Sequence, residues 1–260
     1  MPGKLYLVPN TLDFGIGSGD HPLPDIQQVL PLGTIEAAAC LTHWVTENAK
    51  TTRAFLKRVH AVRPLPLPLQ ELHLVELPRP PKGQRGAIPA PDLSALLQPA
   101  LDGSDIGLNC EAGMPAVADP GAELVRQAHE LGIEVVPLVG PSALLLALAA
   151  SGMNGQSFAF VGYLPVEEPA RAQRIKELEA LARRAGQTQL MIETPYRNAA
   201  LLQALLKHLQ PGTRVSVSCA LTLDDGWTAS AAVSRWRERS GPGSRQLPAD
   251  RPAVFAIHAS

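Results

Sequence analysis

The residues best placed for chemistry lie in segment 110–121, CEAGMPAVADPG, which follows a predicted strand and precedes a predicted helix. In open α/β sheets, ligands bind at the carboxyl ends of strands, where such loops lie. Gly113 permits close approach of the backbone to a ligand, and Pro115 stiffens the turn. Glu111 could hold a cationic or hydroxyl group of a ligand. Equally, Asp119 and Pro120 could simply begin the following helix, as N-cap and N1 proline, with Glu111 a solvated carboxylate.

A second turn of the same kind is VGPSA at 139–143, between a predicted strand and an apolar helix. Ser142 is a favourable N-cap residue, which would account for it on structural grounds alone. The functional alternative is that free backbone amides at this helix start face a ligand.

The elements that must position these turns alternate between strand and helix. We predict strands at 5–8, 44–47, 72–77, 106–110, 133–139, 158–163, 189–193, 214–221 and 253–258, and helices at 50–59, 92–101, 119–132, 142–152, 169–185 and 198–209. Segment 227–239 is ambiguous, a strand and then a short helix. This alternation predicts an α/β fold with mostly parallel sheets. The series restarts near 152–156, so we expect two domains, 1–152 and 153–260.

Composition excludes several classes of protein. Of 260 residues, 45% are hydrophobic, which excludes disorder, and the net charge of −1 excludes a protein that binds nucleic acid through bulk positive charge. The three cysteines form no CxxC and the seven histidines are scattered, so we expect no metal site. No signal-like leader or uninterrupted apolar span is evident, so we expect a cytoplasmic protein outside the membrane.

The basic residues concentrate in the first half of the chain. The proline-rich stretch 64–91 contains Arg79, Lys82 and Arg85, and could be a surface connection or a mobile basic loop over a site. Lys50 and Arg53 could hold a phosphate or a substrate carboxylate, although helix-surface residues of this kind are commonly only solvated.

Five segments in order resemble motifs of the tetrapyrrole methylase superfamily, most closely its ribosomal RNA small-subunit methyltransferase I branch. They read TENAKTTRAFL, CEAGMPAVADPGAELV, VGPSALLLAL, FAFVGYLP and ETPYR, where the branch has AEDTRxTxxLL, SDAGxPxxxDPG, PGPSAL, FxGFLP and ESPxR. The resemblance runs from about residue 5 to 221. It implies two α/β domains with a cofactor cleft between them, S-adenosylmethionine as methyl donor, and a homodimer.

Carried over motif by motif, the resemblance implies residues that bind the donor. These are Glu111, Gly113, Met114, Pro115, Ser142, Ala143, Glu193, Thr194, Ala220 and Leu221. Tyr163, Leu164 and Pro165 match the FLP turn. For methyl transfer to a ribose hydroxyl, Glu47 is the candidate catalytic base, because its strand ends on the same side. Its alternative is a carboxylate at the start of the next helix. Lys50 and Arg53 are the candidate substrate-binding residues.

The chain departs from the family pattern at three places. The Asp of SDAG is Glu111, and the acidic pair of AEDTR is Glu47-Asn48, which could remove a base or a substrate contact. The first loop contains GIGSGD at 15–20, which echoes the GxGxGD of the tetrapyrrole-modifying branch and is interpreted as a flexible loop. We therefore carry three hypotheses. The first is methylation of small-subunit ribosomal RNA at a ribose 2'-oxygen; the others are methylation of a tetrapyrrole or other small anion, and donor binding without catalysis.

Overall fold

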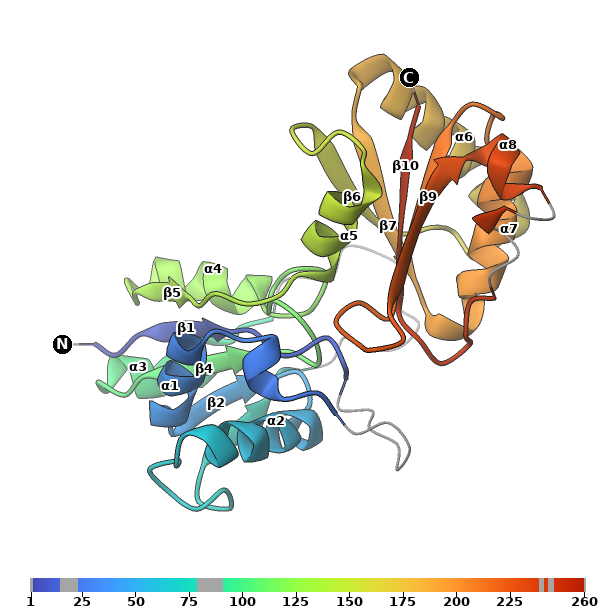
Figure 1. Ribbon diagram of the computed structural model, residues 1–260. Coiled ribbons are helices and arrows are strands. Elements are labelled where there is room, and N and C mark those ends of the chain that lie inside the picture. Colours follow the sequence, from blue (N-terminus) through green and yellow to red (C-terminus); the bar gives the residue numbers. More distant parts are fainter. Residues whose placement is uncertain (1, 15–22, 79–90, 239–240, 243–245, 260) are drawn as a thin grey trace. The chain divides into compact units, whose positions relative to one another are not determined.

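The computed structural model describes residues 2–14, 23–78, 91–238, 241–242 and 246–259 (Figure 1). The chain divides into two compact units, residues 1–142 and 143–260. The sequence places the division later, at 152. The helix in question, α5 (Ala143–Ser151), packs through Ala147 and Leu148 on Leu190, Val254 and Ala256 of the second sheet, which is why it belongs to the second unit.

The first unit is a parallel sheet of five strands in the order β3-β2-β4-β1-β5. The strands are β1 (Leu5–Val8), β2 (His43–Thr46), β3 (His73–Glu76), β4 (Ile106–Asn109) and β5 (Val135–Pro137). The helices are η1 (Ile26–Gln28), α1 (Leu32–Cys40), α2 (Ala49–Val62), α3 (Ser94–Leu101) and α4 (Ala122–Glu130). Every residue of β4 is buried, as expected for a central parallel strand covered on both faces.

Two cores cover the two faces of this sheet. On one face, α1 and α2 pack on Val8, Trp44 and Leu72. On the other, α3 and α4 pack on Leu5, Val45 and Leu108. The chain leaving β1 therefore turns to one face, and the chain leaving its neighbour β4 turns to the opposite face. This is a topological switch point, where open α/β sheets bind ligands.

Glycine is required at position 107, in the middle of β4. A Cβ at Gly107 would lie 2.6 Å from the Trp44 ring, which fills the space above this strand. Trp44 is 1% exposed, and its indole N–H donates to the carbonyl of Leu41. The close approach of ring to backbone thus locks β2 against β4.

The second unit is a mixed sheet in the order β6-β7-β10-β8-β9. The strands are β6 (Phe158–Tyr163), β7 (Thr188–Glu193), β8 (Arg214–Cys219), β9 (Trp227–Ala232) and β10 (Ala253–His258). The helices besides α5 are α6 (Glu168–Ala185), η2 (Pro195–Arg197), α7 (Asn198–His208) and α8 (Val233–Trp236). The last strand, β10, enters between β7 and β8 and pairs antiparallel with both, so parallel pairing is confined to β6–β7.

The segment that the sequence left ambiguous is a strand followed by a short helix, β9 and α8. Trp236 closes the core beneath it, 2% exposed, with its indole N–H donating to the carbonyl of Val215. Separately, no helix among the described residues is long and apolar enough to cross a membrane.

Candidate active site at the carboxyl ends of β1, β2 and β4

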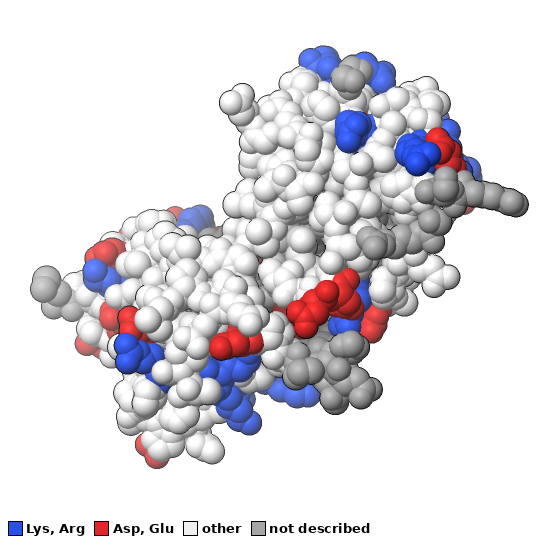
Figure 2. Space-filling view, in the orientation of Figure 1, with Lys and Arg blue, Asp and Glu red and all other residues white. Residues whose placement is uncertain are grey.

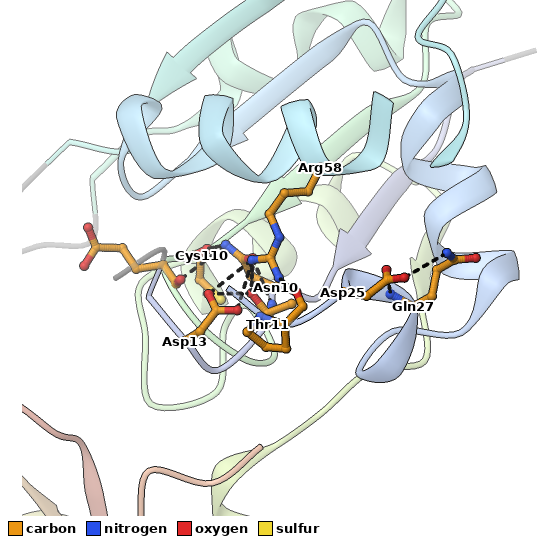
Figure 3. A network of polar contacts seen from close by, with 9 residues as sticks. Asn10, Thr11, Asp13, Asp25, Gln27, Arg58 and Cys110 are labelled. Carbon is orange, nitrogen blue, oxygen red and sulfur yellow. Dashed lines mark hydrogen bonds and ion pairs between the residues drawn. The ribbon is translucent and has the colours of Figure 1, made fainter. Parts of the chain in front are cut away.

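The loop that follows β1 is joined to the loop that follows β4. Asn10 is 5% exposed, and its Nδ2 donates to the carbonyls of Cys110 at 3.0 Å and Glu111 at 3.2 Å (Figure 3). Its backbone N–H donates to the Gly113 carbonyl at 2.9 Å, and its carbonyl accepts from the Gly113 N–H at 3.2 Å. The two loops therefore meet at the switch point as a small antiparallel bridge.

A buried ion pair anchors the β1 loop to α2. The Arg58 guanidinium reaches out from the helix toward the loop (Figure 3), with Nη1 3.0 Å from the Asp13 carboxylate, whose side chain is 2% exposed. Nη1 also donates to Thr11 Oγ1 at 3.0 Å, and Nη2 donates to the carbonyl of Pro24 at 2.9 Å. A planar guanidinium suits this task because it can serve several acceptors in fixed directions.

A row of buried polar side chains ties the ends of the central strands together below the loops. Thr52 of α2 hydrogen-bonds Thr46 at the end of β2, and its hydroxyl donates to Asn109 Oδ1 at 3.1 Å. Asn109 Nδ2 in turn donates to the carbonyl of Val8 at 3.0 Å. Because fully paired buried polar groups hold one geometry, the carboxyl ends of β1, β2 and β4 form a rigid base for the loops.

Glu47, the predicted base, lies directly after β2 and reaches the β4 loop. Its Oε2 accepts a hydrogen bond from the backbone N–H of Glu111 at 3.0 Å, and its own N–H donates to the carbonyl of Asn109. Glu47 also directly precedes the N-cap of α2, so the alternative interpretation, a carboxylate at the start of that helix, is compatible with its position. The residue that caps α2 is Asn48, whose Oδ1 accepts from the N–H groups of Lys50 and Thr51.

A third loop, 138–142, approaches the same place. Gly113 has φ +74°, and a Cβ there would lie 3.3 Å from Leu12 and 3.5 Å from the Pro141 carbonyl. Gly140 lies so close to Pro9 that a Cβ would come within 2.3 Å of its ring. The glycines at 113 and 140 thus let the loops after β1, β4 and β5 pack against one another.

The β4 loop also brings acidic groups together around Cys110. Burial, the nearby charge of Glu47 and the charge of Glu111 raise the pKa of Asp119 to about 7, and a hydrogen bond from the Cys110 thiol partly offsets this. Burial and the charges of Asp119 and Glu47 likewise raise the pKa of Cys110, so its thiol stays protonated. The thiol also points at the carbonyls of Ala112 and Gly113. Cys110 is therefore a packing residue and not a nucleophile.

The prediction that Asp119 and Pro120 begin helix α4 is wrong. The helix begins at Ala122 and its N-cap is Gly121, with φ 127° and no side-chain cap. Glycine is favoured there because a φ of +127° strains any residue with a side chain, and a Cβ would also lie 2.9 Å from the end of the Leu108 side chain. The Asp119 carboxyl therefore does not cap the helix and instead lies near Cys110, Glu47 and Glu111. The sequence signal for this was the glycine immediately after Asp-Pro, which competes for the cap position.

Strained backbone gathers in three loops of the described chain. Non-glycine residues with positive φ occur after β1 at Phe14, after β4 at Ala116 and Ala118, and after β8 at Ala220 and Thr222. Such conformations cost free energy and persist where the surrounding structure fixes them, most often at functional sites. Two of these loops are the ones that form the bridge between Asn10 and Gly113.

The structure thus collects one part of the predicted site within the first unit. Glu47 is hydrogen-bonded to Glu111, and Gly113, on the same loop as Glu111, is paired with Asn10. Met114 and Pro115 continue this loop, half-buried and buried. Ser142, half-buried, follows Pro141. Lys50 and Arg53 are exposed on α2, and Ala143 is the first residue of α5 in the second unit.

The remaining predicted residues lie in the second unit, where the inner strands β7 and β8 end. Glu193 ends β7 and Cys219 ends β8, and both are register partners of Ala253 in β10. The turns Glu193-Thr194 and Ala220-Leu221 therefore leave the sheet on either side of one strand. Glu193 is 8% exposed and its carboxylate accepts hydrogen bonds from the Thr194 N–H at 2.7 Å and from Arg197 Nη2 at 2.6 Å.

Two sequence features fall outside the described residues, namely GIGSGD at 15–20 and the basic residues at 79, 82 and 85. Tyr163 ends β6 and is exposed, whereas Leu164 is buried in the core of its own unit. Within the part of the chain that the structure describes, no group of three or more His, Cys, Asp or Glu side chains could hold a metal ion.

The profile of the family described as Tetrapyrrole (Corrin/Porphyrin) Methylases matches residues 40–230. The chain therefore belongs to the tetrapyrrole methylase family, which confirms the resemblance found in its motifs and makes it a member of a family of methyltransferases.

Similar proteins include ribosomal RNA small subunit methyltransferase I of Vibrio cholerae and of Escherichia coli O157:H7, at 38% and 35% identity. Each match covers 49% of this chain and 43% of the relative. The matched region thus spans less than half of each relative. The fold is shared with a uroporphyrin-III-C-methyltransferase from Thermus thermophilus, with a TM-score of 0.50 and 17% identity over 98% of this chain and 94% of that one. It is also shared with the methyltransferase CobJ, with a TM-score of 0.52 and 15% identity over 99% and 95%. These structures confirm the α/β class with two sheets.

Proposed function

We propose that this protein transfers a methyl group from S-adenosylmethionine to a ribose 2'-hydroxyl of small-subunit ribosomal RNA. The main support for the donor is the conformation of the β4 loop, residues 110–121. The loop has strained backbone and is braced by hydrogen bonds at the topological switch point of the first sheet. A loop fixed in this way binds a ligand without first losing conformational freedom.

The residues present fit such a donor chemically. The donor carries an ammonium group and ribose hydroxyls, which carboxylates and backbone carbonyls accept well. Glu111 supplies a carboxylate on the loop and Asp119 a carboxyl group with a pKa of about 7, and Gly113 has no side chain to obstruct a ligand. When bound, the donor supplies an electrophilic methyl group on a sulfonium. The chain's part is to align the two reactants, exclude water and take up the proton of the hydroxyl.

RNA as the acceptor is supported by the relatives and by charge on α2. Lys50, Arg53 and Lys57 are exposed and recur at helical spacing, so they form one basic stripe, and Figure 2 shows basic side chains gathered over this helix. Arg58, the next basic residue in the helix, is not part of the stripe, because it forms an ion pair with the buried Asp13. Contacts to phosphates supply much of the affinity of proteins for RNA, so this stripe gives a nearly neutral chain a local site for it.

The departure at Asn48 does not weaken the proposal. Asparagine and aspartate are comparable N-cap residues, and Asn48 caps α2 through its side-chain oxygen. The carboxylate that touches the β4 loop is Glu47, which the chain keeps. The change from the family's acidic residue to an amide therefore alters a helix cap and leaves the contact with the loop in place.

Calorimetric titration with S-adenosylhomocysteine, the demethylated product, tests the donor. We expect micromolar binding at one site per chain, lost in Gly113→Val because a β-branched residue at φ +74° is strained and adds bulk beside Leu12. Transfer of labelled methyl groups to undermethylated small ribosomal subunits, but not to porphyrin precursors, tests the acceptor. Binding without transfer to either would leave a donor-binding protein that lacks catalysis. Unchanged affinity in a folded Gly113→Val variant would remove the β4 loop from the site.

A further inference from the structure

We propose that Asn10 is a positioning residue for the methyl donor: its side-chain amide sets the conformation of the β4 loop at residues 110–113, and the donor's affinity depends on that amide. The inference rests on the proposed function, because it assumes that this loop binds the donor. Neither Asn10 nor any other residue of the β1 loop was among the site residues predicted from the sequence.

Each polar group of Asn10 has a partner in the structure. Nδ2 donates to two successive carbonyls of the β4 loop, and Oδ1 accepts from the N–H of Thr11 at 2.8 Å. The backbone N–H and carbonyl both pair with Gly113. The partner of Oδ1 is a donor and the partners of Nδ2 are acceptors, so the orientation of the amide is fixed by chemistry.

The peptide unit between Cys110 and Glu111 is held from two sides. Its N–H, that of Glu111, donates to the Glu47 carboxylate after β2, and its carbonyl, that of Cys110, accepts from the Asn10 amide after β1 at 3.0 Å. Rotation of this peptide would break both hydrogen bonds. The loop that carries Glu111 and Gly113 is therefore fixed at its start, a few residues before Ala116 and Ala118, whose φ angles are positive.

Arg58 supports Asn10 indirectly, through Thr11. Thr11, whose N–H binds Asn10 Oδ1, also accepts a hydrogen bond from Arg58, which in addition binds Asp13 and Pro24. Helix α2, the β1 loop and the β4 loop thus form one continuous series of contacts (Figure 3). The consequence is that the rigid part of the fold determines the shape of the loop through the amide of one side chain.

Only a side chain with both a donor and an acceptor of this size can serve here. Asn10→Asp keeps the acceptor for Thr11 but sets a carboxylate oxygen against two carbonyls, and these repel each other. Asn154→Asp is a matched control in the second unit. Asn154 Nδ2 likewise donates to a backbone carbonyl, that of Gly186, while Oδ1 accepts from the N–H groups of Gln156 and Ser157.

The experiment titrates the wild-type chain, Asn10→Asp and Asn154→Asp with S-adenosylhomocysteine, with thermal unfolding recorded for each. At about pH 8, where an aspartate is ionised, we expect Asn10→Asp to lose between about tenfold and about a hundredfold in affinity. Asn154→Asp should bind as the wild type does, although both variants unfold at lower temperature. At about pH 5.5 the affinity of Asn10→Asp should approach that of the wild type, because burial favours protonation of the introduced carboxyl, which then donates to a carbonyl.

The outcomes separate this inference from the proposed function. If the wild type binds the ligand and folded Asn10→Asp binds equally well at both pH values, the positioning role is overturned and the proposed function stands. A loss of affinity shared by Asn154→Asp would mean that lower stability alone weakens binding, which also overturns it. A wild-type chain that fails to bind overturns the proposed function, and the inference with it.

Discussion

The carboxylate of Glu47 and the backbone N–H of Glu111 are joined by a 3.0 Å hydrogen bond between the end of β2 and the loop after β4. The residue that sequence motifs single out as a base thus also braces the loop that is proposed to bind the donor. The two tasks can be separated, because an amide can accept the same hydrogen bond without carrying the charge.

Glu47→Gln should retain the affinity for S-adenosylhomocysteine, since its side-chain oxygen can still accept from Glu111. Glu47→Ala should lose it, because the N–H of Glu111 then has no partner from β2. Titration calorimetry of both variants measures this, and equal affinities would exclude the bracing role. If Glu47 is in addition the base, as the sequence predicts, methyl transfer by Glu47→Gln falls about a hundredfold or more at saturating donor.

Asp119 makes stability depend on pH. Its pKa is about 7 in the folded chain, above its ordinary value of 3.8, because it is buried near Glu47 and Glu111. The folded state therefore holds a proton that the unfolded state has released, and stability falls as pH rises from about 4 through about 7. Asp119→Asn should unfold at a higher temperature than the wild type at about pH 8 and lose this advantage below about pH 4. Thermal unfolding across this range measures it, and a constant difference between the two proteins would contradict the assignment.

Loss of the Arg58–Asp13 ion pair should destabilise the first unit. Arg58→Met leaves a buried carboxylate without its guanidinium, at a cost of about 3 kcal/mol in the free energy of unfolding. The double variant Arg58→Met/Asp13→Asn should recover part of that loss, because no buried charge remains. Urea denaturation of the wild type, Arg58→Met, Asp13→Asn and the double variant completes a double-mutant cycle, and strict additivity would show that the two residues act independently.

The basic stripe on α2 should govern how RNA binding responds to salt. Replacing Lys50, Arg53 and Lys57 by Gln removes three exposed cations, so the slope of log K against log salt should become less negative by about 2 for single-stranded RNA. The matched control replaces Lys176, Arg183 and Arg184, which are exposed on α6. Equal slopes for the two triple variants would remove α2 from the RNA interface.

Sequence patterns predicted the existence and type of most elements because their signals are local. The apolar spacing of Phe55, Leu56 and Val59 gave helix α2, and the buried run at 106–109 gave β4. The insertion of β10 between β7 and β8 could not be predicted in this way. It depends on pairing between segments separated by more than thirty residues, about which periodicity carries no information.

The candidate site was predictable only as far as its motifs reach. Glu111 and Gly113 could be named because a strand-to-helix turn rich in glycine marks the end of a parallel strand. Asn10 could not, because its importance comes from carbonyls a hundred positions away along the chain. Asp119 was assigned to a helix cap on local preference, and Gly121 holds that position instead, because its φ of +127° favours glycine.

The cap at Asn48 has a consequence for how this family should be read across species. Two adjacent acidic residues in a motif need not be under one constraint. Here the side chain at position 48 caps α2, and the side chain at position 47 braces the loop that we propose binds the donor. Exchange between asparagine and aspartate at position 48 should therefore drift among relatives without any change of acceptor. A loss of the carboxylate at position 47 should instead mark lineages in which methyl transfer has been abandoned.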